Sequence, residues 1–210
     1  MTKDKVYNLI ILDESGSMQS IKSMIISGFN EVVQTVKGAA KEFPEQEHYI
    51  SFISFNSRKL KTHLDCQPVA ELDEIDAGKY RPDSTTPLFD AMGFGINQLR
   101  EKISVEKNSN VLVTILTDGM ENASKEYDRQ AIKALVDELQ KGNWTFTYIG
   151  TDHDVEGFAV SISIKNTMNF GKNAAGLKKM FDKENMSRSR YYQSIREKKI
   201  RKENFYSDDK

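Results

Sequence analysis

The fold is decided by the stretch Val6-Tyr7-Asn8-Leu9-Ile10-Ile11-Leu12, which is followed at once by Asp13-Glu14-Ser15-Gly16-Ser17-Met18. The first seven residues form a short apolar run, a pattern typical of a strand buried on both faces of a parallel sheet. The run ends at a carboxylate and two hydroxyls, and helical periodicity begins directly afterwards. Ligands of open α/β sheets bind at the carboxyl ends of strands, so this turn is predicted to lie at a functional edge.

The side chains of this turn favour a hard cation. Asp13, Ser15 and Ser17 alternate along the loop, and their oxygens suit magnesium, manganese or calcium better than zinc or copper. Gly16 allows a sharp turn between the two serines. The alternative is that one serine only caps the next helix, which would leave the aspartate at the end of the strand unexplained.

A second apolar run, 111–116, is also predicted to be a buried strand. It is followed by Thr117-Asp118-Gly119, so Asp118 should reach the same edge of the sheet as Asp13. A simple turn at Asp118-Gly119 is the alternative.

The two turns, together with Ser84-Thr85-Thr86-Pro87-Leu88-Phe89-Asp90-Ala91, resemble the metal-ion-dependent adhesion site of von Willebrand factor type A domains, of the stand-alone type found inside bacteria. The resemblance covers roughly residues 5–170, with all three parts in the family's order. Ser84-Thr85 departs from the family's usual glycines, which puts the backbone path of that loop in question.

The resemblance implies a divalent cation, usually Mg²⁺ and alternatively Mn²⁺ or Ca²⁺. It would be held by Ser15, Ser17 and Thr86, with Asp13 and Asp118 bound directly or through water. An acidic group of a partner protein would then complete the octahedron. The expected function is therefore a metal-dependent protein-binding module without catalytic residues. Six residues are predicted to rim the contact: Met18, Gln19, Pro87, Met120, Glu121 and Asn122.

An enzyme is the alternative, in the form of a metal-dependent phosphohydrolase that uses Asp13 as nucleophile. Haloacid-dehalogenase-like enzymes also place an aspartate after their first strand, and they usually carry a second one two residues later as acid/base. Here that position is Ser15, a poor proton donor, so we favour binding.

Strands alternate with helical patterns along the chain, which predicts an α/β fold with a doubly wound, Rossmann-like and mostly parallel sheet covered by helices on both faces. Residues 59–64 alternate in polarity and are predicted to form one antiparallel edge strand. A short helical turn is expected within 72–77. The motif expected for dinucleotides and that expected for a P-loop are both missing from the sequence.

Charged residues are distributed unevenly along the chain. We predict a von Willebrand factor type A-like domain over 1–171 and a basic extension over 172–210, helical from about 174 to 199 with a disordered end. The extension holds 12 Lys and Arg against 6 Asp and Glu, whereas the whole chain has a net charge of −1. A solvated helix face explains this best. Single-stranded nucleic acid is a weaker alternative, suggested by three tyrosines among the basic residues: Tyr191, Tyr192 and Tyr206.

The remaining polar residues give weaker indications. One cysteine, Cys66, and no membrane-spanning run or signal-peptide pattern lead us to expect a cytoplasmic protein. His48 and His63 are predicted to be surface residues rather than metal ligands. Asp152 and Asp154 are predicted to begin a helix rather than hold a second metal.

Overall fold

The computed structural model describes residues 3–106, 109–200 and 202–207, and its centre is a six-stranded sheet in the order β3-β2-β1-β4-β5-β6. Of the six strands that the structure describes, only β3 runs antiparallel to its neighbour. The strands are β1 (Asp4–Asp13), β2 (Gln46–Asn56), β3 (Lys59–Pro68), β4 (Ser109–Leu116), β5 (Trp144–Gly150) and β6 (Asn166–Asn169). The apolar run predicted as the organising strand is β1, and it lies in the middle of the sheet.

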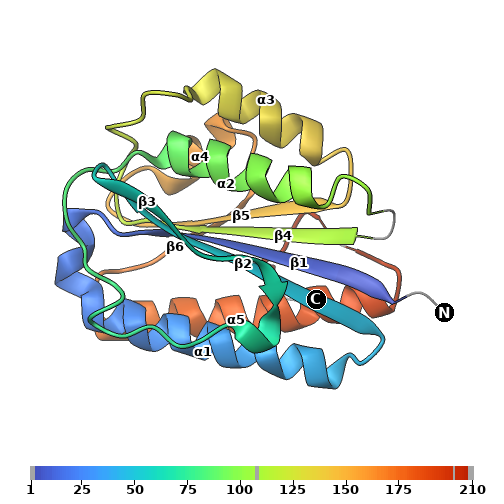
Figure 1. Cartoon of the computed structure of the whole chain (residues 1–210). Coiled ribbons are helices and arrows are strands. Elements are labelled where there is room, and N and C mark those ends of the chain that lie inside the picture. Colours follow the sequence, from blue (N-terminus) through green and yellow to red (C-terminus); the bar gives the residue numbers. More distant parts are fainter. Residues whose placement is uncertain (1–2, 107–108, 201, 208–210) are drawn as a thin grey trace.

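Helices cover both faces of this sheet (Figure 1). On one face lie α1 (Lys22–Glu42) and α5 (Ala174–Arg196); on the other lie α2 (Leu88–Lys102), α3 (Arg129–Leu139) and α4 (Val155–Ser161). Alternate residues of β1 enter two separate cores, with Ile10 and Leu12 under α1 and α5, and Leu9 and Ile11 under α2. The predicted fold class, including its one antiparallel edge strand, is confirmed.

Two short 3₁₀ segments, Gly16–Ile21 and Val69–Glu71, complete the described elements. The prediction of a helical turn within 72–77 is wrong, since residues 72–76 are irregular, residue 77 begins a non-helical turn and the short 3₁₀ segment lies just before, at Val69–Glu71. His48 also differs from expectation: it is 5% exposed because it lies on β2 under α5, where its ring meets Tyr192 edge-on. None of the helices in the described part of the chain is long and apolar enough to cross a membrane.

The C-terminal region is part of the packed body. Helix α5 crosses α1 so closely that a Cβ atom added at Gly28 would lie 1.9 Å from the ring of Phe181. Beyond the helix, Phe205 and Tyr206 are buried, contrary to the expectation of a disordered end; residues 201 and 208–210 lie outside the described residues. The three tyrosines considered for base stacking are all buried, so their rings are not available to nucleic acid.

Candidate metal centre

The predicted site residues lie at one edge of the sheet, where β1 and β4 end. Asp13 is the last residue of β1, and Asp118 follows two residues after the end of β4. This is the edge on the left of Figure 1, from which the chain passes into α1. Both carboxylates are buried, with 0% and 2% of their residue surface exposed, whereas Ser17 is exposed. The two carboxylates of this group of predicted site residues are therefore buried, and the group is accessible to solvent at Ser17.

A chain of hydrogen bonds joins the two turns. The Ser15 backbone N–H donates to Asp13 Oδ1 at 2.7 Å, and the hydroxyl oxygens of Ser15 and Ser17 lie 3.2 Å apart. Ser17 Oγ then donates to Asp118 Oδ1 at 2.5 Å. The Asp-x-Ser-x-Ser spacing thus turns alternate side chains toward one centre, as the sequence predicts.

Thr86 arrives at the same centre from a third loop. Its backbone is held to Asn122 by two hydrogen bonds: its N–H donates to the Asn122 side chain at 2.9 Å, and its carbonyl accepts the Asn122 N–H at 3.1 Å. A Cβ atom built on Gly119 would lie 3.7 Å from Thr86 Oγ1 and 3.8 Å from Ser17 Oγ. The two hydroxyls therefore face the same small space beside Asp118, and all five predicted residues are brought together.

The loop that departs from the family pattern keeps a glycine-like backbone. Ser84 has φ of 65°, in the left-handed region that glycine adopts without cost. Its carbonyl accepts the Gly16 N–H at 2.9 Å, and a Cβ atom on Gly16 would lie only 3.3 Å from that oxygen. The absence of a side chain at Gly16 thus allows residues 13–18, which we call the metal loop, to approach residues 84–88, which we call the threonine loop.

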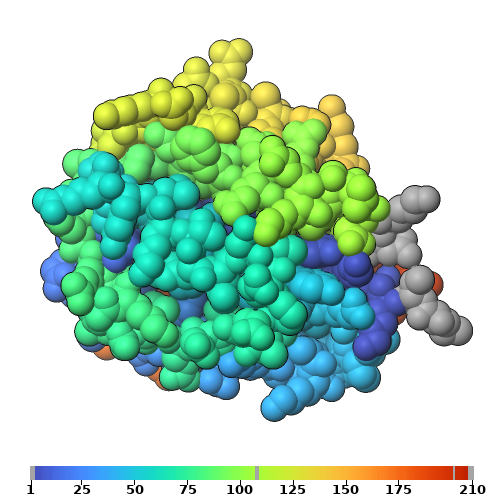
Figure 2. All heavy atoms as spheres, viewed as in Figure 1, coloured from blue at the N-terminus to red at the C-terminus, as the bar shows by residue number. Residues whose placement is uncertain are grey.

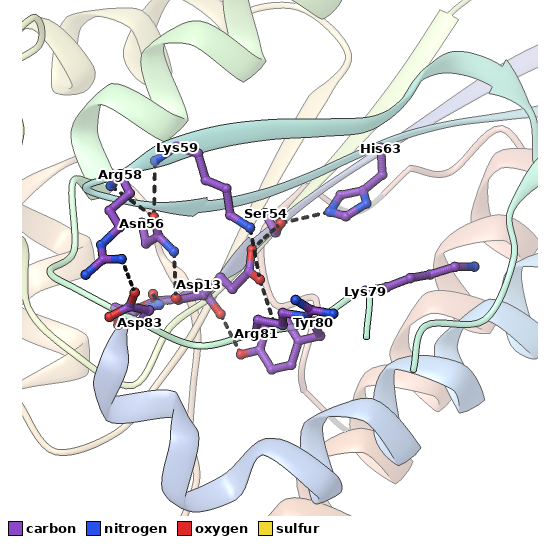
Figure 3. A network of polar contacts seen from close by, with 12 residues as sticks. Asp13, Ser54, Asn56, Arg58, Lys59, His63, Lys79, Tyr80, Arg81 and Asp83 are labelled. Atoms are coloured by element: carbon purple, nitrogen blue, oxygen red, sulfur yellow. Dashed lines mark hydrogen bonds and ion pairs between the residues drawn. The ribbon is translucent and has the colours of Figure 1, made fainter. Parts of the chain in front are cut away.

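Glu14 anchors the metal loop to the neighbouring strands from its buried side. Sequence reasoning did not predict this role. Its side chain is fully buried and accepts hydrogen bonds from Ser54 Oγ at 2.8 Å and from the Arg81 N–H at 2.6 Å. Lys59 Nζ lies 3.6 Å from it. Figure 3 shows these partners gathered around the loop, with Tyr80 donating to the Asp13 carbonyl at 2.7 Å. The site is therefore positioned by neighbouring β2, β3 and the 79–83 segment.

The electrostatics of the two acids differ. Burial raises the pKa of Asp13 to about 6, although hydrogen bonds from Thr117 and Ser15 favour its charged form. Asp118 Oδ2 accepts no well-directed hydrogen bond among the described residues, but lies 2.8 Å from Lys172 Nζ, an ion pair that Lys172 shares with Asp152 at 2.6 Å. Lys172 is thus a cation at the rim of the site that sequence reasoning missed.

The donor set fits a hard divalent cation. It consists of two carboxylates and three hydroxyls, which are ligands of magnesium-class ions rather than of zinc or copper. No group of three or more His, Cys, Asp or Glu side chains suited to a metal lies within the described ranges, so the hydroxyls are essential to any site here. The buried Asp118 Oδ2 is paired among the described residues with the Lys172 ammonium, and an external cation at this centre would compete with that lysine for it.

The residues predicted to rim a partner contact differ in exposure. Gln19, Met120 and Asn122 are exposed and Pro87 is half-buried, but Met18 is fully buried in the core beneath α1 and cannot touch a partner, so that part of the prediction is wrong. Glu121 is engaged in local structure, because its carboxylate accepts N–H groups of residues 89, 123 and 124.

Asp154 begins α4, as predicted, and its side chain accepts the Gly157 N–H. Asp152 instead pairs with Lys172, whose partners no local sequence signal identifies.

Comparison with known proteins places these observations in a family. The profile of the von Willebrand factor type A domain matches residues 9–194. No curated protein matches the chain. Among solved structures, proximal thread matrix protein 1 from the mussel byssus is similar with a TM-score of 0.60 at 12% identity, over 90% of this chain and 47% of that one. This chain therefore spans about half the length of the byssus protein.

Two further solved structures share the fold. The pilus adhesin SpaC from Lactobacillus rhamnosus GG matches with a TM-score of 0.64 at 11% identity, over 91% of this chain and 31% of that one. The SpRpn10 VWA domain matches with a TM-score of 0.52 at 12% identity, over 85% of this chain and 94% of that one. At these identities the likeness shows the fold alone.

Proposed function

Because the match over residues 9–194 shows that this chain belongs to the von Willebrand factor type A family, we propose that it is a metal-dependent protein-binding module. Domains of this family are mostly non-enzymatic and often serve adhesion or protein interaction. The observation that carries the proposal is the convergence of five oxygen-bearing side chains from three loops on one partly open centre. Ser15, Ser17, Thr86, Asp13 and Asp118 would hold a magnesium-class ion, which supplies a positive centre for an anionic ligand.

Charge accounting favours an acidic partner. The three hydroxyls are neutral, so two carboxylates balance the charge of a divalent ion, and Lys172 already neutralises part of Asp118. A cation held in this way keeps affinity for an anion, and an Asp or Glu of a partner is the commonest anion on a protein surface. Exposed Ser17 lies where such a carboxylate can approach.

The geometry at Asp13 supports binding over the phosphohydrolase alternative. Both of its oxygens are engaged, one with the Ser15 N–H and the other with Thr117 Oγ1 at 2.5 Å, and the residue is fully buried. A nucleophilic Asp13 would have to give up one of these hydrogen bonds to attack a substrate, whereas as a metal ligand it keeps both and holds the ion with a remaining lone pair or through water.

The cytoplasmic location and bacterial origin expected from the sequence stay proposals.

The test is calorimetric titration of Mg²⁺ into the chain and into the Ser15→Ala/Ser17→Ala variant. We expect the variant to lose at least tenfold in affinity, because two of the three hydroxyl ligands are removed. Ser27→Ala on α1 is the control and should bind as the native chain does. Equal affinity in the native chain and the double variant would refute the metal assignment.

A further inference from the structure

A groove lies next to the threonine loop, between the β2–β3 turn, the start of α2 and the segment around residue 123. It encloses about 580 Å³. Figure 2 shows this side of the molecule, with the β2–β3 turn in cyan projecting beside α2 in green. Thr85 and Pro87 both line the groove, and Thr86 of the candidate metal centre stands between them. Thr86 itself is buried and does not line the groove, so the groove and the candidate metal centre are neighbours joined through the loop that carries Thr86.

The groove carries two exposed apolar side chains. Leu60, on β3, is 39% exposed, and Phe94, on α2, is 44% exposed. Phe94 is held in place by an edge-on contact with Tyr127, at 5.4 Å between ring centroids. Large rigid apolar groups exposed at the lining of a groove are typical anchors for a partner's side chain.

The charges of the groove are mainly positive. Arg58, Lys59 and Lys125 line it, against one acid, Asp90. Asp90 is occupied by the protein itself, since its carboxylate accepts the backbone N–H groups of residues 125, 126 and 127. Arg58 and Lys59 each have one acidic neighbour but remain solvent-exposed. In a chain of net charge −1, this is a local surface suited to an acidic ligand.

We propose that this groove binds an extended, acidic segment of a partner protein that carries a large apolar side chain close to its metal-binding carboxylate. The placement of that carboxylate rests on the proposed function, whereas the apolar and cationic contacts of the groove do not. The apolar pair favours a peptide over a single-stranded nucleic acid, because aliphatic Leu60 offers no ring and the groove therefore lacks the succession of aromatic rings on which bases stack. The groove would thus select among acidic partners that the metal centre by itself treats alike.

The probe is a phage-displayed library of random dodecapeptides, selected on the full chain in Mg²⁺. We expect enriched peptides to combine Asp or Glu with a nearby aromatic or large aliphatic residue. Synthetic copies of them should bind Phe94→Ser, Leu60→Ser and Lys125→Glu at least tenfold more weakly than the native chain. Met186→Ser is the matched control, since Met186 is 59% exposed on α5, outside the groove. Thermal melting and Mg²⁺ calorimetry of every variant confirm that fold and metal binding are intact.

The outcomes separate the groove from the metal centre. Peptide binding that persists in EDTA but is lost in the groove variants would uphold the groove and refute the metal-dependent function. Binding that needs Mg²⁺ and is unchanged in all three groove variants would refute the groove and uphold the function. Failure to enrich any peptide, enrichment of basic peptides, or displacement of the peptides by a fluorescein-labelled dT20 oligonucleotide would each overturn the inference.

Discussion

Two groups of buried polar side chains can be compared in this molecule, the candidate metal centre at the sheet edge and a second group beneath α5. The second group, which we call the α5 cluster, is built around Arg188, which is fully buried. Its guanidinium donates to Glu184 at 2.7 Å, to Thr114 at 2.8 Å and to Asn8 at 3.0 Å. Tyr206 donates to the other carboxylate oxygen of Glu184 at 2.7 Å.

The difference between the two lies in where the cation comes from. The α5 cluster contains its own cation. Of the buried side-chain nitrogen and oxygen atoms described in this cluster, Arg188 Nε is the one left without a hydrogen-bond partner. The metal centre has two buried carboxylates, neutral hydroxyls and one lysine at its rim. A buried charged group with its counter-ion built in is a structural device, whereas a group of acids and hydroxyls open to solvent is suited to an external cation.

The largest effect is expected from breaking the α5 cluster. Arg188→Met leaves Glu184 buried without its counter-ion, which costs about 3–5 kcal/mol of unfolding free energy. Urea denaturation followed by circular dichroism measures it. The double variant Arg188→Met/Glu184→Gln should recover part of the loss, because no charge is then stranded. Lys178→Met, which removes an exposed ion pair on the same helix, is the control and should change stability by less than about 1 kcal/mol. A double variant no more stable than the single one would contradict the account.

A smaller effect on the free energy of unfolding is expected at His48. This buried side chain belongs to neither group and receives no hydrogen bond from either. Its two ring nitrogens have no hydrogen-bond partner among the described residues, and burial lowers its pKa from 6.5 to about 4. Between these values the unfolded chain binds a proton that the folded chain does not, so stability falls as the pH drops through this window and levels off below it. The full shift corresponds to about 3 kcal/mol as an upper bound.

The test compares His48→Phe with the native chain by urea denaturation from pH 7 to pH 4. The variant should lose less stability than the native chain over this range, because phenylalanine keeps the ring but cannot bind a proton. Asp13 acts with the opposite sign in the same range, since its pKa is raised to about 6, but that contribution is common to both chains and cancels in the difference. Parallel stability profiles would show that His48 does not titrate in this way.

The same comparison explains what sequence reasoning could reach. The residues of the candidate metal centre were predicted from the sequence. Asp13, Ser15, Ser17 and Asp118 come directly after apolar runs typical of buried strands, and Thr86 was identified through the resemblance to von Willebrand factor type A domains. The predicted assignment of a metal to those residues stays a prediction. The fold class could be predicted because each strand and helix has its own local hydrophobic periodicity, and the order of these elements indicates a parallel sheet covered by helices.

The α5 cluster could not be predicted in this way. Its hydrogen-bonded pairs join residues as far apart as Asn8 and Tyr192, which are separated by 184 positions, and no motif marks an asparagine in a strand as the partner of a distant helix. A charged helix with Arg188 and Glu184 resembles a solvated face, and only the position of α5 over the sheet shows that one side is buried. The anchoring of Phe205 and Tyr206 depends on the same long-range packing.

The smallest effect, and the sharpest test of the comparison, concerns Lys172. Its Nζ atom lies 2.8 Å from Asp118 Oδ2 and 2.6 Å from Asp152 Oδ2, so it competes with an external cation for the same buried carboxylate. Lys172→Met should therefore raise the affinity for Mg²⁺ by about three- to tenfold, or about 1 kcal/mol for a partly exposed charge in water. Lys172→Arg keeps the charge and should leave the affinity close to native. Calorimetry at low and high salt measures both variants, and the difference should shrink at high salt because the lysine is partly exposed. If Lys172→Met bound Mg²⁺ more weakly, the lysine would be orienting Asp118 for the ion instead of competing with it, and the metal centre would carry a built-in positioning cation just as the α5 cluster does.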